Sequence, residues 1–268
     1  MGIAVRMVRC GGFSMRYFRF GQGARSMVIL PGLSVQSVMG SADAVAQAYG
    51  TMAEDFTVTV FDRREELPAV YSVSEMAEDT ARAMAELGMK DVCLFGASQG
   101  GMMAMLIAAR HPELVGRLAL GSTAARVDPE RAGTLAGWVR LAEDGDAAGL
   151  YRSFGEAVYP VPVFAGLSDL LAEAAKTVTA EELARFAVLA RGTEGFDASD
   201  EVPAIRCPVL ALTASDDRVL GPDTAAEFER LFGGRVDFSL HVYDGYGHAA
   251  YDTAPDYREQ LYRFFTAG

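Results

Sequence analysis

The sequence of 268 residues lacks an uninterrupted apolar run of the length that a membrane span requires. A span needs roughly 18 to 20 continuous apolar residues, and charged residues or glycines interrupt every apolar stretch before that length. The first ten residues include Arg6 and Arg9, where a signal peptide would need an unbroken apolar segment. We therefore predict a cytoplasmic protein without a membrane partner.

Cysteine is scarce, and basic residues are outnumbered by acidic ones. The three cysteines, Cys10, Cys93 and Cys207, lie in or beside apolar segments, which favours buried thiols over a disulfide framework. They and the three histidines show no metal-ligand spacing, so we expect neither a metal nor a cofactor. Lys and Arg total 24 against 36 Asp and Glu, giving a net charge of −12 that would repel a phosphate backbone. Nucleic acid is therefore excluded as a partner.

Strand-like and helix-like segments alternate along most of the chain. The expected strands are 3–9 and 13–20, which form a hairpin, then 26–30, 57–61, 92–95, 118–120, 209–213 and 236–242. The expected helices of this pattern are 74–87, with Ser74 as N-cap, then 101–110, 224–231 and 255–265. Such alternation is typical of a parallel sheet with crossover helices on its faces.

The alternation stops after Gly121 and resumes near Val209. Residues 123–201 contain several helical patterns separated by Gly and Pro, and no convincing buried strand. We predict that residues 1–122 and 202–268 form a core domain and that residues 123–201 form a helical insertion.

The segment Gly96-Ala97-Ser98-Gln99-Gly100 follows an apolar strand and leads directly into a helix. Gly-x-Ser-x-Gly in this setting is typical of a nucleophile elbow, a tight turn from strand to helix. Glycines flank the serine because its strained backbone leaves no room for neighbouring Cβ atoms. The amides of the helix N-terminus favour developing negative charge. Ser98 is therefore the candidate nucleophile.

The elbow and the order of the residues after it resemble the α/β-hydrolase superfamily. Members of that family carry nucleophile, acid and histidine in this chain order. Here segments 213–219 and 246–249 follow strands at the places where the family has its acid and its histidine. The resemblance implies an α/β-hydrolase fold with about eight mostly parallel strands, helices on both faces and an inserted helical cap.

The resemblance assigns catalytic roles to three side chains. Ser98 would attack the substrate, His248 would accept and return the proton, and Asp217 would hold the imidazole. The family places its acid three residues after a small residue and two before an apolar one, which matches Asp217. A slip of one residue would give Asp216 instead, and Asp244 is a further alternative.

Two backbone N–H groups are expected to stabilise the oxyanion. In this fold one comes from the residue after the nucleophile, Gln99, and the other from the loop after the third strand. That loop is Leu30-Pro31-Gly32-Leu33-Ser34, which resembles the family's His-Gly-x stretch with Pro31 in place of the histidine. Leu33 would therefore be the second donor.

The insertion resembles the cap that many family members place over the nucleophile. We expect Met102, Trp138, Phe154 and Phe164 to line an apolar pocket for a small-molecule substrate.

The expected reaction is hydrolysis of a small, largely apolar carboxylic ester through an acyl-enzyme. The same triad would support C–C bond, amide or thioester hydrolysis or cofactor-free perhydrolysis. An alternative of another class is a ligand-binding protein with slow turnover. The sequence is compatible with a homo-oligomer.

Overall fold

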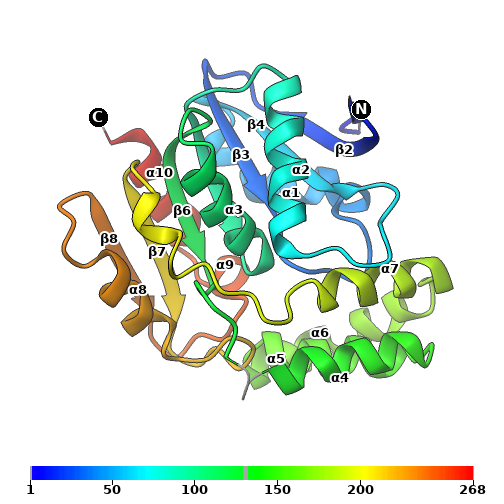
Figure 1. The fold of residues 1–268 in the computed structure, drawn as a ribbon. Coiled ribbons are helices and arrows are strands. Elements are labelled where there is room, and N and C mark those ends of the chain that lie inside the picture. Colours follow the sequence, from blue (N-terminus) through cyan, green and yellow to red (C-terminus); the bar gives the residue numbers. More distant parts are fainter. Residues whose placement is uncertain (1, 129–131, 268) are drawn as a thin grey trace.

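The computed structural model, which describes residues 2–128 and 132–267, is built around one sheet of eight strands (Figure 1). The strands are β1 (Val5–Cys10), β2 (Phe13–Phe20), β3 (Arg25–Leu30), β4 (Phe56–Arg64), β5 (Val92–Ala97), β6 (Val115–Gly121), β7 (Val209–Ala214) and β8 (Phe238–Tyr243). Their order across the sheet is β1-β2-β4-β3-β5-β6-β7-β8. β2 pairs antiparallel with β1 and β4, and the remaining neighbours are parallel. This confirms the predicted sheet of about eight mostly parallel strands.

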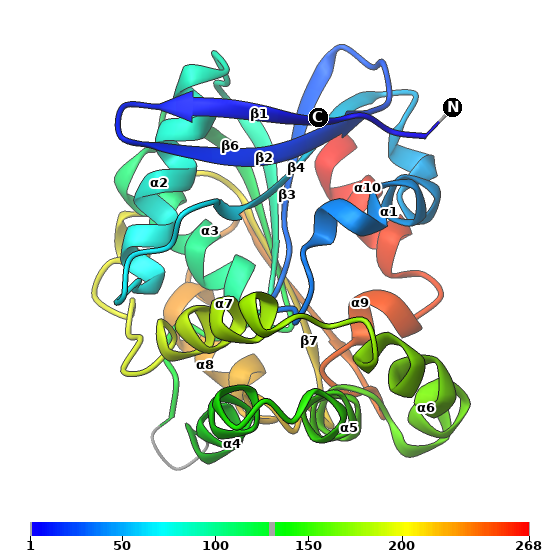
Figure 2. The ribbon, with the colours of Figure 1, turned by 90° about the vertical axis from the view of Figure 1, so that its right-hand side faces the viewer.

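Helices cover both faces of the sheet (Figure 2). One face carries α2 (Val73–Glu86), α3 (Gln99–Arg110) and α8 (Thr224–Phe232), and the other carries α1 (Ala42–Ala48) and α10 (Tyr257–Thr266). Short elements complete the described chain: η1 (Val38–Ser41), η2 (Gly50–Met52), η3 (Val202–Ala204) and α9 (Ala250–Thr253). None of the helices in the described ranges combines the length and the apolar character that a bilayer span would need.

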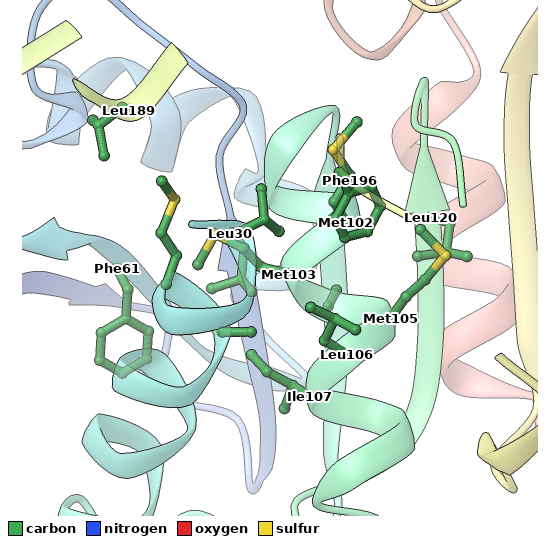
Figure 3. Close-up of a cluster of buried hydrophobic side chains, with 14 of the residues drawn as sticks. Leu30, Phe61, Met102, Met103, Met105, Leu106, Ile107, Leu120, Leu189 and Phe196 are labelled. Atoms are coloured by element: carbon green, nitrogen blue, oxygen red, sulfur yellow. The ribbon is translucent and has the colours of Figure 1, made fainter. Parts of the chain in front are cut away.

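The helix α3 lies deep in the core beneath the site. Ten of its twelve residues are buried. Figure 3 shows Met103 pointing toward Leu30 of β3 and Met105 pointing toward Leu120 of β6, so that the helix is packed between neighbouring strands and the helices above them. The N-terminus of α3 is therefore held rigidly against the sheet.

The helix α2 begins earlier than the sequence analysis expected. Its N-cap is Ser72, whose side chain accepts a hydrogen bond from the Glu75 backbone, while the Glu75 carboxylate accepts one from the Ser72 backbone. The predicted N-cap, Ser74, is wrong because this reciprocal capping box at Ser72 satisfies the backbone amides of both Ser72 and Glu75. The Ser74 hydroxyl instead accepts a hydrogen bond from Arg110.

Four helices connect β6 to β7: α4 (Ala132–Glu143), α5 (Ala147–Val158), α6 (Val161–Ala175) and α7 (Ala180–Arg191). They lie together across the edge at which the parallel strands end (Figures 1 and 2). Where the chain leaves and re-enters the sheet, Arg126 and Asp197 form an antiparallel bridge. The connection is therefore helical, with its two ends paired.

The strand order reverses beside β5. The chain passes from β3 to β4 on one side and then crosses back to β5 on the other side of β3. In α/β sheets, such a reversal leaves a crevice at the carboxyl ends of the two strands. Leu33 follows β3 and Ser98 follows β5, so that both predicted site segments lie at this crevice.

Candidate active site

Ser98 occupies a strained turn between β5 and α3. Its φ is 52° and its ψ is −124°, a conformation that costs a non-glycine residue about 1–3 kcal/mol. Its N–H donates to the Gly121 carbonyl at 2.8 Å, and its own carbonyl accepts from the Thr123 hydroxyl at 2.7 Å. These bonds hold the turn against β6 and its following loop.

The two glycines of the elbow permit close backbone approach. A Cβ on Gly96 would lie 2.3 Å from the Gly100 carbonyl oxygen. A Cβ on Gly100 would lie 2.0 Å from the Leu30 carbonyl oxygen. Real Cβ atoms do not approach backbone so closely, and therefore both positions require glycine.

Ser98, His248 and Asp217 form one chain of hydrogen bonds. His248 Nε2 lies 2.9 Å from Ser98 Oγ, and His248 Nδ1 lies 2.8 Å from Asp217 Oδ2. The side chains of His248 and Asp217 are only 4% and 1% exposed. Although these residues are 31 to 150 positions apart in the sequence, the carboxyl ends of β5, β7 and β8 bring them together.

Asp217 is held as a carboxylate. Its Oδ1 accepts backbone hydrogen bonds from Val219 at 2.8 Å and Leu220 at 2.9 Å. Burial opposes its ionisation, but the charge of His248 and the hydrogen bonds from His248, Leu220 and Val219 outweigh burial and lower the pKa of Asp217 below its usual value. The side chain can therefore orient the imidazole and offset a positive charge on it.

The other two acid candidates lie elsewhere. Asp216 is exposed, and its backbone N–H donates to the Tyr246 carbonyl. Asp244 is also exposed and accepts a hydrogen bond from the Ser215 hydroxyl at 3.2 Å. The structure therefore places Asp217, and neither alternative, against His248.

The two expected oxyanion donors flank Ser98. Leu33 and Gln99 both line the cavity beside it. Gly32 lies so close to Ser98 that a Cβ on Gly32 would be 3.1 Å from Ser98 Cβ. The loop after β3 therefore packs directly on the elbow.

The side chain of Gln99 joins the elbow to its surroundings through three hydrogen bonds. Its Oε1 accepts from Arg63 Nη2 at 2.8 Å, and its Nε2 donates to the Leu189 carbonyl at 2.7 Å and to the Thr193 hydroxyl at 2.9 Å. Arg63 is buried, which lowers its pKa to about 10 and leaves it a cation at neutral pH. The sequence analysis missed Arg63 and Thr193, since neither lies in a motif.

The cavity beside Ser98 has a volume of about 20 Å³. Of the four predicted pocket residues, Met102, Trp138 and Phe154 line it. Phe164 is not among its described lining residues, because its ring packs against Gly155 of α5 within the helical connection. The lining also includes Leu135, Val158, Val219, Leu220 and Tyr251, which the sequence analysis missed.

A model of the alpha/beta hydrolase fold matches residues 28–255 of the sequence. The chain belongs to the α/β hydrolase family. It is therefore a hydrolase, and this family acts on small molecules. In the described part of the chain, no group of three or more His, Cys, Asp or Glu side chains could hold a metal ion.

Curated relatives of this α/β hydrolase include the "Putative carbamate hydrolase RutD" of Rhizobium rhizogenes (strain K84 / ATCC BAA-868). It is 25% identical over 253 residues, which cover 91% of this chain and 94% of that protein. The mouse (Mus musculus) "Serine hydrolase BPHL" is 26% identical over 132 residues, 46% of this chain and 44% of that protein.

Solved structures share the fold of this α/β hydrolase. The enol-lactonase from Burkholderia xenovorans LB400 superposes with a TM-score of 0.82 at 18% identity, over 98% of this chain and all of that one. The alpha/beta hydrolase MGS-M2 from a deep-sea metagenome library gives 0.85 at 19% identity, over 99% and 98% of the two chains. These likenesses extend the family assignment to the architecture of the whole chain.

Proposed function

We propose that this α/β hydrolase cleaves small, largely apolar carboxylic esters through an acyl-enzyme intermediate. The observation that carries the proposal is the chain of hydrogen bonds from Ser98 Oγ through His248 to Asp217, at 2.9 and 2.8 Å. A serine hydroxyl is a weak nucleophile at neutral pH, and a base at this distance can activate it.

In the proposed reaction, Ser98 Oγ attacks the ester carbonyl carbon while His248 Nε2 takes the hydroxyl proton. Asp217 holds the Nδ1–H and stabilises the imidazolium. The negative charge on the carbonyl oxygen is stabilised by the backbone N–H groups of Leu33 and Gln99. His248 then protonates the departing alkoxide, and a water molecule activated by the same imidazole releases the acid and frees Ser98.

We propose that residues 123–201 act as the cap of this site and that residues 1–122 and 202–268 form its core. The pairing of Arg126 with Asp197 at the two ends of the connection supports this division. Trp138 and Phe154 pack with ring centroids 4.7 Å apart and line the cavity from the cap side. An apolar wall there would exclude bulk water and strengthen the electrostatic interactions inside.

A fluorophosphonate probe tests the nucleophile. The wild type is expected to be labelled and to hydrolyse p-nitrophenyl acetate, and Ser98→Ala is expected to lose both. Ser168→Ala, at a half-buried position of α6, is the matched control and should retain both. Labelling of Ser98→Ala at the wild-type rate would refute the assignment.

A second candidate is hydrolysis of a carbamate, which the name of the RutD relatives favours. A cavity of about 20 Å³ has room for about one water-sized group, which fits the amino group of a carbamate as well as the methyl group of an acetate. Phenyl carbamate and phenyl acetate separate the two proposals, because they share the leaving group. A higher kcat/KM for the carbamate would favour this second reading.

A further inference from the structure

A second and larger cavity lies on the other side of the oxyanion loop. Its volume is about 290 Å³, against about 20 Å³ for the cavity at Ser98. We call it the outer chamber. The two cavities share five lining residues, namely Gly32, Leu33, Phe154, Val158 and Tyr251. The two cavities therefore adjoin at these five residues, beside the nucleophile.

We infer that the substrate is an ester of a small acyl group with a bulky, uncharged alcohol or phenol, and that the alcohol part occupies the outer chamber. This inference rests on the proposed function. The cavity at Ser98 has room for about one water-sized group, whereas the chamber approaches the size of a ligand pocket. The two halves of the substrate must therefore differ greatly in size.

The segment that follows His248 assigns the alcohol to the chamber. The imidazole, which lines the small cavity, must protonate the leaving oxygen, so the leaving group lies beside it. Tyr251 lines both cavities, with its ring centroid 6.4 Å from that of His248, and the next residue, Asp252, lines the chamber and not the small cavity. The carbonyl of Val158, which also lines both cavities, accepts a hydrogen bond from the N–H of Ala249, next to His248. The acyl substituent then occupies the small cavity beside Met102 and Trp138.

The lining of the outer chamber selects against a charged substituent. Ile29, Val38, Val45 and Phe95 supply apolar surface, and no Lys or Arg is found among the described residues that line it. Arg258 lies 5.2 Å from the ring centroid of the chamber residue Tyr49, and it pairs at 3.6 Å with Asp252, which also lines the chamber. A carboxylate would lose its hydration there without gaining a cation, which is costly.

The tyrosines of the chamber remain neutral. Burial, aided by nearby Asp252, raises the pKa of Tyr159 to about 12. Burial also raises the pKa values of Tyr49 and Tyr251. Their hydroxyls therefore remain protonated near pH 7 and can donate hydrogen bonds to an oxygen on the alcohol part.

Two ester series with the wild-type enzyme test the assignment of the two halves. Lengthening the acyl part from phenyl acetate to phenyl octanoate should lower kcat/KM at least about tenfold. Enlarging the alcohol part from phenyl acetate to 2-naphthyl acetate should not lower kcat/KM. A preference for phenyl octanoate over phenyl acetate would overturn the inference.

A matched pair of esters tests the charge selection. Methyl 4-acetoxybenzoate and 4-acetoxybenzoate differ in one carboxylate remote from the scissile bond. The uncharged ester should be favoured at least about tenfold in kcat/KM. Equal or higher kcat/KM for the anionic ester would show that the chamber does not exclude charge.

Filling the chamber tests its location. Val45→Trp in α1 should lower kcat/KM for 2-naphthyl acetate at least about tenfold more than that for methyl acetate. Val236→Trp, at a fully exposed position, is the control and should change neither. The labelling rate with a fluorophosphonate shows whether the Val45→Trp variant retains a competent Ser98.

The failures of the two proposals are distinguishable. If no ester is hydrolysed in a manner that depends on Ser98, the proposed function fails. If esters are hydrolysed but Val45→Trp lowers the activity on phenyl octanoate and spares 2-naphthyl acetate, the acyl and alcohol sites are reversed and only this inference fails.

Discussion

At the scale of single residues, two adjacent aspartates have opposite surroundings. Asp217 is buried against His248 and accepts two backbone N–H groups, whereas Asp216 is exposed. If the proposed mechanism holds, Asp217→Asn leaves His248 without the carboxylate that fixes its tautomer. We expect kcat to fall by about 10³- to 10⁴-fold.

Asp216→Asn is the matched control for that prediction and should leave kcat within about twofold. Steady-state hydrolysis of p-nitrophenyl acetate measures both variants. A larger loss in Asp216→Asn than in Asp217→Asn would assign the acid to the other position. Thermal unfolding of both variants shows that the comparison is made between folded proteins.

Gln99 is a second residue whose side chain holds the geometry of the elbow. Gln99→Met keeps the backbone N–H proposed for the oxyanion but loses the bonds to Arg63, Leu189 and Thr193. The turn is then free to shift, and small displacements of a donor are costly to catalysis. We expect kcat to fall about 10- to 100-fold while KM stays within about twofold.

Thr193→Val removes only one of those three bonds, and its effect on kcat should be correspondingly smaller. A role limited to stability would show instead as a lower melting temperature in Gln99→Met with an unchanged kcat. That result would contradict the prediction.

At the scale of elements, the start of α2 offers a comparison between two serines. Ser72→Ala removes the side-chain half of the capping box and should cost about 1 kcal/mol of the free energy of unfolding. Ser74→Ala removes one half-exposed hydrogen bond to Arg110 and should cost less. Urea unfolding measures both variants. The reverse ranking would restore the N-cap that the sequence analysis expected.

The capping box also predicts a dependence on pH. The backbone and side-chain hydrogen bonds from Ser72 lower the pKa of Glu75 from 4.5. A depressed pKa in the folded state contributes stability that is present above pH 4.5 and is lost as the pH falls through the lowered value. The difference in stability between wild type and Glu75→Gln should therefore shrink on acidification, and a difference that grew would contradict the assignment.

The elements also show which features a sequence predicts. The elbow, the acid loop and the histidine loop are contiguous motifs next to strongly apolar strands, so the sheet and Ser98, Asp217 and His248 could be predicted from the sequence. Arg63 and Tyr251 could not, because their contributions arise only when distant segments pack. Phe164 was expected in the pocket for its apolar character alone, and the helical connection uses that character to pack against Gly155.

At the scale of the whole molecule, α7 is the helix that ties the connection to the sheet. Arg185 on α7 donates hydrogen bonds to the backbone carbonyls of Arg63, Arg64 and Glu65, at 2.8 to 3.1 Å. It also lies 3.7 Å from the Asp62 carboxylate. The C-terminal part of α7 reaches Gln99 through the Leu189 carbonyl. The helix therefore connects the end of β4 to the elbow.

Removing this tie should destabilise the molecule more than removing a surface ion pair. Arg185→Leu removes the donor to the carbonyls at the end of β4 and one ion pair of Asp62. We expect a loss of about 2 to 3 kcal/mol in the free energy of unfolding, because hydrogen bonds to charged groups are the stronger ones.

Arg191→Leu, on the same helix, removes only an exposed pair with Glu143 and should cost less than about 1 kcal/mol. Urea unfolding gives both values. Limited proteolysis should cleave within residues 123–201 faster in Arg185→Leu than in the wild type, and no faster in Arg191→Leu. Equal losses in the two variants would mean that α7 is held by its apolar face rather than by Arg185.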